Sequence, residues 1–203
     1  MSRRRFARLF VVPLVMAPAL LAGAVRPLAA AEIAGVRFEP MLKGGDAPGE
    51  MVLNGVALHR LFGFQVYAIA LYLAQRQKSA EAAISADGPR RIVMHLLRDI
   101  TAAQLSAALT EGIEDNHPAD EVEKLRPRMA SVDRIMLEIG KAGRGSRIAL
   151  DWVPGQGTRV VVDGKVRGEP IPGADFYRAL LRIWLGARPI RDHLKQGMLG
   201  GGA

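Results

Sequence analysis

The stretch of ten residues from 64 to 73, FQVYAIALYL, places the strongest constraint on how this chain can fold. It contains no charged residue, and Gln65 is its only amide. Its length and its aromatic and β-branched residues favour a β-strand. A strand that is apolar at nearly every position has both of its faces covered, unlike a strand with one face in water. The sequence therefore predicts a sheet with a further layer on each side of this strand.

The remaining segments are grouped as strands, then helices, then a hairpin, then helices again. We predict further strands at residues 36–41, 51–58, 91–97, 147–153, 158–162 and 165–168, with a tight turn at Asp163-Gly164. We predict helices at residues 79–85, 101–115, 119–139 (interrupted at Pro127), 172–186 and 188–198. Thr101 and Gln104 form a capping-box pattern at the start of the second helix. Because nothing alternates as strand–helix–strand, the order indicates an α+β fold, an antiparallel sheet with a helical layer on one face.

Length and composition limit the classes of protein and of site. The chain has 203 residues, of which 49% are hydrophobic and 24% are charged. These values indicate one globular domain with a substantial core rather than a disordered chain. The absence of cysteine excludes a disulfide scaffold, a thiolate metal site and a cysteine nucleophile. The four histidines do not have the spacing of metal ligands, so we expect neither a metal nor another cofactor.

Residues 1–31 have the pattern of an export signal. Four arginines lie between residues 3 and 8, an apolar run follows from Leu9 to Val25, and small residues precede a cleavage site that we predict after Ala31. The alternative is a retained N-terminal anchor, although two prolines and a length of roughly 17 residues make the run a poor membrane span. We therefore expect a mature domain at residues 32–203, located in the periplasm and without a stable membrane span.

The export signal also changes what the net charge means. The whole chain carries 28 basic and 20 acidic residues, a formal net charge of +8. Five of the basic residues and none of the acidic ones lie in residues 1–31, which leaves 23 basic against 20 acidic residues and a net charge of +3. This small excess gives no reason to expect a nucleic-acid partner. Residues 2–6, SRRRF, resemble the twin-arginine export motif, and general secretion is the alternative.

His59, Arg60, Tyr67 and Tyr72 form the most informative group of polar residues. They fall on neighbouring, mostly apolar predicted strands. If a cleft lies between the sheet and the helices, the Arg60 guanidinium would bind a carboxylate or an enolate, and Tyr67 would add a hydroxyl. The alternative is that Arg60 ends a strand in solvent while both tyrosines pack in the core with satisfied hydroxyls. The spacing alone leaves both interpretations open.

Several segments, taken in their order, resemble the chalcone isomerase-like proteins. Residues 53–55 (LNG) and the strand at 64–73 resemble the early strands of that family, which carry a Gly-x-Gly-x-Arg turn and a Lys-Val-Tyr-x-x-Ala-Leu-Tyr-Leu strand. The resemblance continues through residues 94–100, 150–158 and 175–186, and it is greatest to the bacterial, exported branch. It implies an open-faced β-sandwich, in which a large antiparallel sheet is backed by helices.

The same resemblance implies a cleft and two kinds of activity. The plant enzymes of the family close a chalcone ring to a flavanone, with an arginine that holds the substrate. Related plastid members bind fatty acids in the same cleft, with Arg and Tyr on the carboxylate. Aligned without gaps, the family arginine falls on His59, with Arg60 one place later, and Tyr67 falls where the enzymes have Thr. A slip of one residue turns a strand side chain to the other face, so Arg60 replaces the family arginine only if the turn shifts.

The helical side of the cleft is less polar here than in the enzymes. Positions at which the enzymes place Tyr, Lys and Asn fall on Leu105, Ala108 and Gly112, and a late Thr position falls on Ile183, beside Trp184. The resemblance therefore implies an apolar cleft with one polar end. The residues that we expect at the ligand are His59, Arg60, Tyr67, Tyr72, Leu105, Leu109, Ile183 and Trp184.

Two functions of different classes remain. An apolar cleft suits a fatty acid or another apolar carboxylate better than a polyphenol, so we expect a periplasmic, non-catalytic protein that binds a small apolar or amphiphilic ligand. The alternative is an isomerase or intramolecular lyase of chalcone isomerase type, with His59 as a base. A third possibility, a domain that only scaffolds a partner, requires an exposed apolar patch that no sequence pattern reveals.

Overall fold

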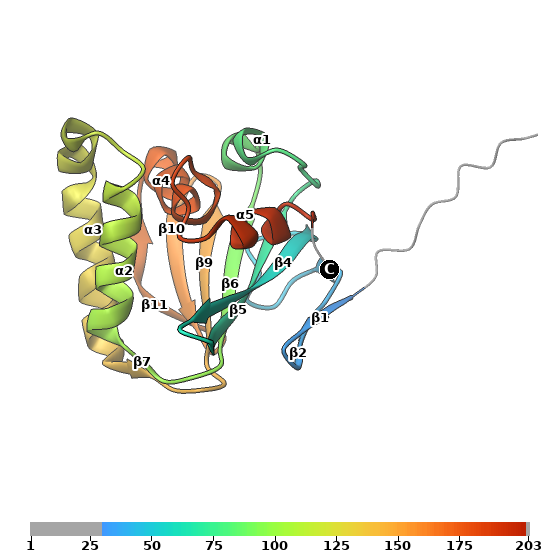
Figure 1. Ribbon diagram of the computed structural model, residues 1–203. Coiled ribbons are helices and arrows are strands. Elements are labelled where there is room, and N and C mark those ends of the chain that lie inside the picture. Colours follow the sequence, from blue (N-terminus) through green and yellow to red (C-terminus); the bar gives the residue numbers. More distant parts are fainter. Residues whose placement is uncertain (1–29, 202–203) are drawn as a thin grey trace, which may run out of the picture.

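The computed structural model describes residues 30–201, which form a seven-stranded sheet with helices packed against one of its faces (Figure 1). The predicted export signal lies almost entirely outside the described residues. Ala31, after which we predict cleavage, is the first residue of strand β1 (Ala31–Ile33). Within residues 30–201, no helix is both long enough and apolar enough to cross a membrane.

The large sheet is antiparallel throughout, and its strand order is β11-β10-β9-β6-β5-β4-β3. The predicted apolar strand is β5, which has the predicted bounds and lies between β4 and β6. The turn at Asp163-Gly164 joins β10 to β11, and both of its residues have positive φ, as a two-residue hairpin turn requires. The strands are β3 (Met41–Leu42), β4 (Met51–Leu61), β5 (Phe64–Leu73), β6 (Arg90–Leu96), β9 (Arg147–Val153), β10 (Gly157–Val162) and β11 (Lys165–Ile171).

The helices form the layer on one face of this sheet, as Figure 1 shows. Their apolar sides and the facing side chains of the sheet share one large buried cluster, to which every helix contributes. The predicted capping box is present, because the Thr101 hydroxyl accepts from the Gln104 amide at 3.2 Å and the Gln104 side chain accepts from the Thr101 amide at 3.0 Å. The helices are α1 (Ala80–Ser85), α2 (Ala102–Glu114), α3 (Ala119–Ile139), α4 (Ala174–Leu185) and α5 (Asp192–Met198).

The opposite face of the sheet has a much smaller cover. The hairpin of β1 and β2 (Val36–Phe38) and the segment at 39–50 pack against a second apolar cluster that includes Phe38, Met51 and Tyr72. A third, two-stranded sheet pairs β7 (Ile100–Thr101) with β8 (Lys141–Ala142), which ties the start of α2 to the end of α3. The predicted α+β fold, an antiparallel sheet with helices on one face, is therefore confirmed, and so is the open-faced β-sandwich.

Two glycines allow the last helix to lie directly on the sheet. A Cβ atom at Gly55 of β4 would lie 2.1 Å from the Gly197 carbonyl oxygen of α5, and one at Gly197 would lie 2.5 Å from the Val56 carbonyl oxygen. Asn54 completes the contact, because its side-chain amide donates to the Met198 carbonyl oxygen at 2.8 Å. The short helix α5 is thus fixed on β4 by backbone proximity and a buried hydrogen bond.

Several predicted boundaries differ from the structure, including the end of strand 36–41, which is β2 at 36–38, and of strand 165–168, which is β11 at 165–171. Helix α3 continues through Pro127 without interruption, because Pro127 lies on the exposed side while a buried stripe from Val122 to Met136 holds the helix against the core. Helix α5 begins at Asp192 rather than at residue 188. Strand β4 extends to Leu61, which places His59 and Arg60 within a strand.

We predict that Gly55→Ala destabilises the protein by about 2–4 kcal/mol, because the added methyl group meets backbone atoms that cannot move aside. Gly143→Ala is the matched control, since a Cβ there would lie 3.6 Å from its nearest neighbour, an Asp99 oxygen. Urea unfolding followed by circular dichroism measures both variants. Equal stability of the two variants would contradict the proposed contact between α5 and β4.

Candidate functional site

Three aromatic side chains from three elements meet where β4 and β5 face the helices. His59 of β4 lies directly opposite Tyr67 of β5 in the sheet register, with ring centroids 4.8 Å apart and ring planes 34° apart. From helix α4, the Trp184 indole N–H donates a hydrogen bond to the Tyr67 hydroxyl oxygen at 3.1 Å. All three side chains are buried. The structure therefore brings together three of the eight residues predicted at the ligand.

This cluster has hydrogen-bonding capacity that the described residues do not use. The Tyr67 hydroxyl accepts from Trp184, but no described residue accepts the Tyr67 proton. The Nδ1 atom of His59 is buried and has no hydrogen-bond partner among the described residues. Buried polar groups are almost always paired, and leaving one unpaired costs about 1–3 kcal/mol. An unpaired Nδ1 beside a hydroxyl that can still donate its proton is the arrangement expected of a site that receives an oxygen-bearing ligand.

The electrostatic surroundings of the cluster favour an anion. Burial lowers the pKa of His59, the nearby charges of Arg191 and His193 act in the same direction, and together they bring this pKa to about 4. Burial raises the pKa of Tyr67 to about 12, against the opposing effects of the Trp184 hydrogen bond and the Arg191 charge. At neutral pH both side chains are uncharged, while the cation Arg191 acts on both of them. A carboxylate would therefore find hydrogen-bond donors in a positive potential.

Arg191 and His193 were not among the predicted site residues. The contact between α5 and β4 brings them to the cluster, and the His193 Nε2–H donates to the Leu58 carbonyl oxygen at 3.1 Å. Their sequence signal is the basic segment around Arg188, Arg191 and His193. This basic segment alone does not indicate a site, because 135 residues of chain separate His193 from Leu58, its hydrogen-bond partner on β4.

Arg60 and Tyr72 do not join the cluster. A register shift separates His59 from Arg60, and the Arg60 side chain is exposed. Tyr72 points to the opposite face of the sheet, where its hydroxyl donates to the Glu39 carbonyl oxygen at 2.9 Å. The expectation that Tyr72 shares a ligand site with Tyr67 is therefore wrong, since side chains five positions apart on a strand lie on opposite faces.

The predicted apolar residues Leu105, Leu109 and Ile183 all lie in the helical layer. Leu105 is half-buried on α2 and packs against the main core. Ile183 of α4 is buried against α2, where a Cβ at Gly112 would lie only 2.6 Å from an Ile183 methyl group. This close approach of α2 and α4 shows that Gly112 and Ile183 form a helix–helix contact.

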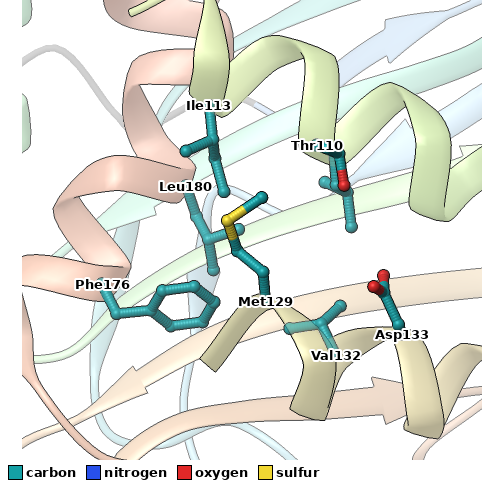
Figure 2. Close-up of a pocket in the computed structure, with 8 residues that line it drawn as sticks. Thr110, Ile113, Met129, Val132, Asp133, Phe176 and Leu180 are labelled. Carbon is teal, nitrogen blue, oxygen red and sulfur yellow. The ribbon is translucent and has the colours of Figure 1, made fainter. Parts of the chain in front are cut away.

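A small cavity lies between α2, α3 and α4, as Figure 2 shows. Its volume is about 10 Å³, which is room for a single water molecule. Leu109 is the only predicted ligand residue that contributes to it. The three helices are therefore closely packed at this place, and the cavity lies among them rather than at the sheet. The cavity is lined by Leu109, Thr110, Ile113, Met129, Val132, Asp133, Phe176 and Leu180.

A second cavity of about 240 Å³ lies on the surface between α4 and the start of α3. Its lining is mostly charged, so it does not suit an alkyl chain. His117 lies within it, with Nδ1 donating to the Ile113 carbonyl oxygen at 2.9 Å and Nε2 accepting from Arg182 at 3.2 Å. The lining residues are His117, Glu121, Lys124, Leu125, Asp175, Arg178 and Arg182.

No group of three or more metal-ligating side chains occurs among residues 30–201. The most deeply buried cation on the helical face of the sheet is Arg90, which lies close to the rings of Trp152 and Tyr177 and donates to the Ile84 carbonyl oxygen at 2.6 Å. These contacts give Arg90 a structural role beneath α1, and sequence spacing offers no signal for it.

Comparison with known proteins agrees with this architecture. A sequence profile described as chalcone isomerase-like matches residues 30–200. The fold is similar to the crystal structure of a fatty-acid binding protein from Arabidopsis thaliana, with a TM-score of 0.67 and 17% sequence identity over 84% of this chain and 96% of that chain. No curated protein sequence matches this chain at a significant level. Since the profile spans nearly all of the described residues, this chain belongs to the chalcone isomerase-like family.

Proposed function

We propose that this protein binds a fatty acid or a similar apolar carboxylate without transforming it. The observation that carries the proposal is the unpaired His59 Nδ1 beside the Tyr67 hydroxyl, whose proton no described residue accepts, in the field of the Arg191 charge. The carboxylate would accept from the Tyr67 O–H and from His59. The fatty-acid binding protein of Arabidopsis thaliana, which shares the fold, supports the same ligand class.

The alkyl chain would lie between the sheet and the helices, against Leu105, Leu109 and Ile183. A ligand of this size needs a pocket of several hundred Å³, far more than the water-sized cavity beside Leu109. Binding therefore includes a shift of the packed helices to a more open arrangement, which the ligand selects by its greater affinity for it. We place this shift in the helix pair α2–α3. Its attachments to the rest of the fold are the short β7–β8 pair, the contact of α2 with α4, the ion pair of Arg128 with Asp175 at 2.6 Å and the packing of Ile135 on Gly168 of β11.

The alternative function, an isomerase or intramolecular lyase, has less support at this site. A general base works best when its pKa lies near the working pH. With a pKa of about 4, His59 is a weak base at neutral pH, and with a pKa of about 12, Tyr67 stays protonated. Both groups are better suited to hydrogen-bond a carboxylate than to move a proton.

We also propose a periplasmic location, which rests on the sequence of residues 1–31 alone. The basic start, the apolar run and the small residues before Glu32 support it. A fatty-acid carrier in that compartment would hold its ligand's apolar chain away from water.

Tyr67→Phe should weaken the binding of C12–C18 fatty acids on the order of tenfold or more, because it removes one hydrogen-bond donor to a charged acceptor. Titration followed by the fluorescence of Trp184, which contacts Tyr67, measures the affinity. Tyr72→Phe is the matched control, a buried tyrosine on the other face of the same strand, and it should bind as the wild type does. Absence of saturable binding in the wild type, together with no lipid in the purified protein, would refute the proposed function.

The His59 ring should titrate with a pKa of about 4 in the free protein and with a higher pKa once a fatty acid is bound, since a carboxylate beside the ring favours its protonated form. Nuclear magnetic resonance of the histidine ring protons, assigned with His59→Gln, measures both values. Because the pKa of His59 is lower in the folded protein, the unfolded chain takes up the proton first as the pH falls from about 6.5 to about 4. The free energy of unfolding should therefore decrease over that range, and it should decrease less in His59→Gln. A free-state pKa near 6.5 would contradict the buried, cation-flanked environment.

Export should leave a mature chain that begins at Glu32. Mass spectrometry of the protein recovered from the periplasm of an expressing bacterium measures this end. Replacing Arg3 and Arg4 by Lys should block export if the twin-arginine route is used, and unchanged export would assign the protein to general secretion. A full-length chain that remains with the membrane fraction would favour the retained anchor.

A further inference from the structure

The turn between β4 and β5 exposes apolar side chains to solvent. Phe62 is 91% exposed, Phe64 67% and Leu61 37%. Together these three side chains present an apolar area on the order of 400 Å². An apolar patch of this kind on the surface of a small protein commonly marks a place of interaction. We call residues 61–64 the hairpin tip.

The backbone of the hairpin tip favours small residues rather than a phenylalanine. Phe62 has φ +49° and Gly63 has φ +82°, so both central residues of the turn lie in the left-handed region. Glycine, asparagine and aspartate are the usual residues at such positions, and an aromatic residue there is strained. Because Phe62 is almost fully exposed, packing within the folded chain does not explain its presence.

The hairpin tip lies at a basic end of the sheet. The register places the end of β6 beside Tyr67, the start of β9 beside His95, and the β10–β11 turn next to β9, so the connecting loops share one end with the tip (Figure 1). The acidic residues at this end are Asp99, paired with Lys141 at 2.6 Å, together with Asp163 and Glu138. The exposed basic residues at this end are Arg60, Arg98, Lys141, Arg144 and Lys165.

We propose that this end of the molecule docks on an anionic lipid bilayer, with Phe62 and Phe64 inserted among the lipids and the surrounding arginines and lysines against the headgroups. The combination of exposed aromatic residues with basic side chains is the pattern of a protein that lies on a membrane surface. The inference goes beyond the proposed function, because it holds whether or not the interior binds a fatty acid.

The dimensions of the hairpin tip favour a bilayer over a protein partner. A stable protein interface buries about 800 Å² on each partner, roughly twice the apolar area of the tip. The tip is also a two-residue turn at the end of two long strands rather than a surface formed by several elements. Insertion into a bilayer needs neither a larger area nor a matching surface.

The experiment compares the wild type with the double variant Phe62→Asn/Phe64→Ser in sedimentation with vesicles of phosphatidylcholine that contain about 30% phosphatidylglycerol. The protein is the chain recovered after export, with the same N-terminus in every variant. Loss of two inserted rings should lower the partition coefficient on the order of tenfold or more. Binding of the wild type should weaken as salt is raised and as phosphatidylglycerol is omitted.

Two features of the design separate docking from damage to the fold. Asparagine tolerates the positive φ at position 62 better than phenylalanine, so Phe62→Asn should keep or raise the unfolding temperature while it weakens vesicle binding. Gln65→Ser alters the same hairpin without removing an apolar side chain and should bind vesicles as the wild type does. Equal vesicle binding by the wild type and the double variant, or none by either, would overturn the proposal.

A spectroscopic variant tests insertion itself. Phe62→Trp places an indole at the hairpin tip, whereas Trp184 is buried and Trp152 is partly buried. Bromine-labelled lipids in the vesicles should quench the emission of this variant and leave that of the wild type unchanged. Absence of quenching, or a doubling of mass in solution that Phe62→Asn abolishes, would assign the tip to another partner and overturn the proposal.

Discussion

Burial of strand β5 on both of its faces is the constraint on which the rest of the structure depends. Its side chains alternate between the helical layer, reached by Tyr67, Ile69 and Leu71, and the smaller outer layer, reached by Ala68, Ala70 and Tyr72. Each fully buried aliphatic side chain contributes about 1.5–3 kcal/mol relative to exposure. A strand of this kind is stable only at the centre of a sheet with cover on both sides. The helices, the β1–β2 hairpin and the segment before β4 provide that cover.

The outer cover depends on an ion network that the hydrophobic pattern alone does not explain. Asp151 of β9, fully buried, accepts from Arg91 at 2.6 and 2.8 Å and from Arg159 at 2.8 Å. Arg91 and Arg159 also donate to the Asp46 carbonyl oxygen, each at 2.6 Å. Charges buried in this way are stable only when each has its partners, because removing one leaves another uncompensated. The network thus holds the segment that precedes β4 against the sheet, and so supports the strand that carries His59.

The sequence is most informative where a local rule decides the structure. The apolar run of β5, the Thr101–Gln104 capping box and the Asp163-Gly164 turn all follow from side-chain chemistry within a few residues, and each was predictable. Pro127 is different, because the local rule that a proline breaks a helix is overridden by the packing of the buried stripe from Val122 to Met136.

The candidate site was predictable only in part, because it depends on register. The pairing of His59 with Tyr67 requires the two-residue turn of the hairpin, and the register shift after His59 turns Arg60 out to solvent, which no spacing rule reveals. The placement of Tyr72 away from Tyr67 follows from strand alternation alone and was open to prediction. The role of α5 could not be predicted. Its contact with β4 requires glycine both at Gly55 and at Gly197, and these two residues lie far apart in the chain.

The two proposals concern one hairpin and predict an orientation for the ligand. Only the pair Arg60–Gln65 lies between the hairpin tip and the His59–Tyr67 pair, so a carboxylate held at His59 and Tyr67 would lie near the end that we propose docks on a membrane. The apolar residues proposed for the tail, Leu109 and Ile183, lie further along the helical layer, toward the C-terminal half of α2. A fatty acid taken from a bilayer through this end would therefore enter with its tail first and its carboxylate last. The carboxylate would then reach His59 and Tyr67 only after the alkyl chain has entered the protein completely. Hydrogen bonds to these two residues would therefore stabilise the final complex and not the initial encounter of fatty acid and protein.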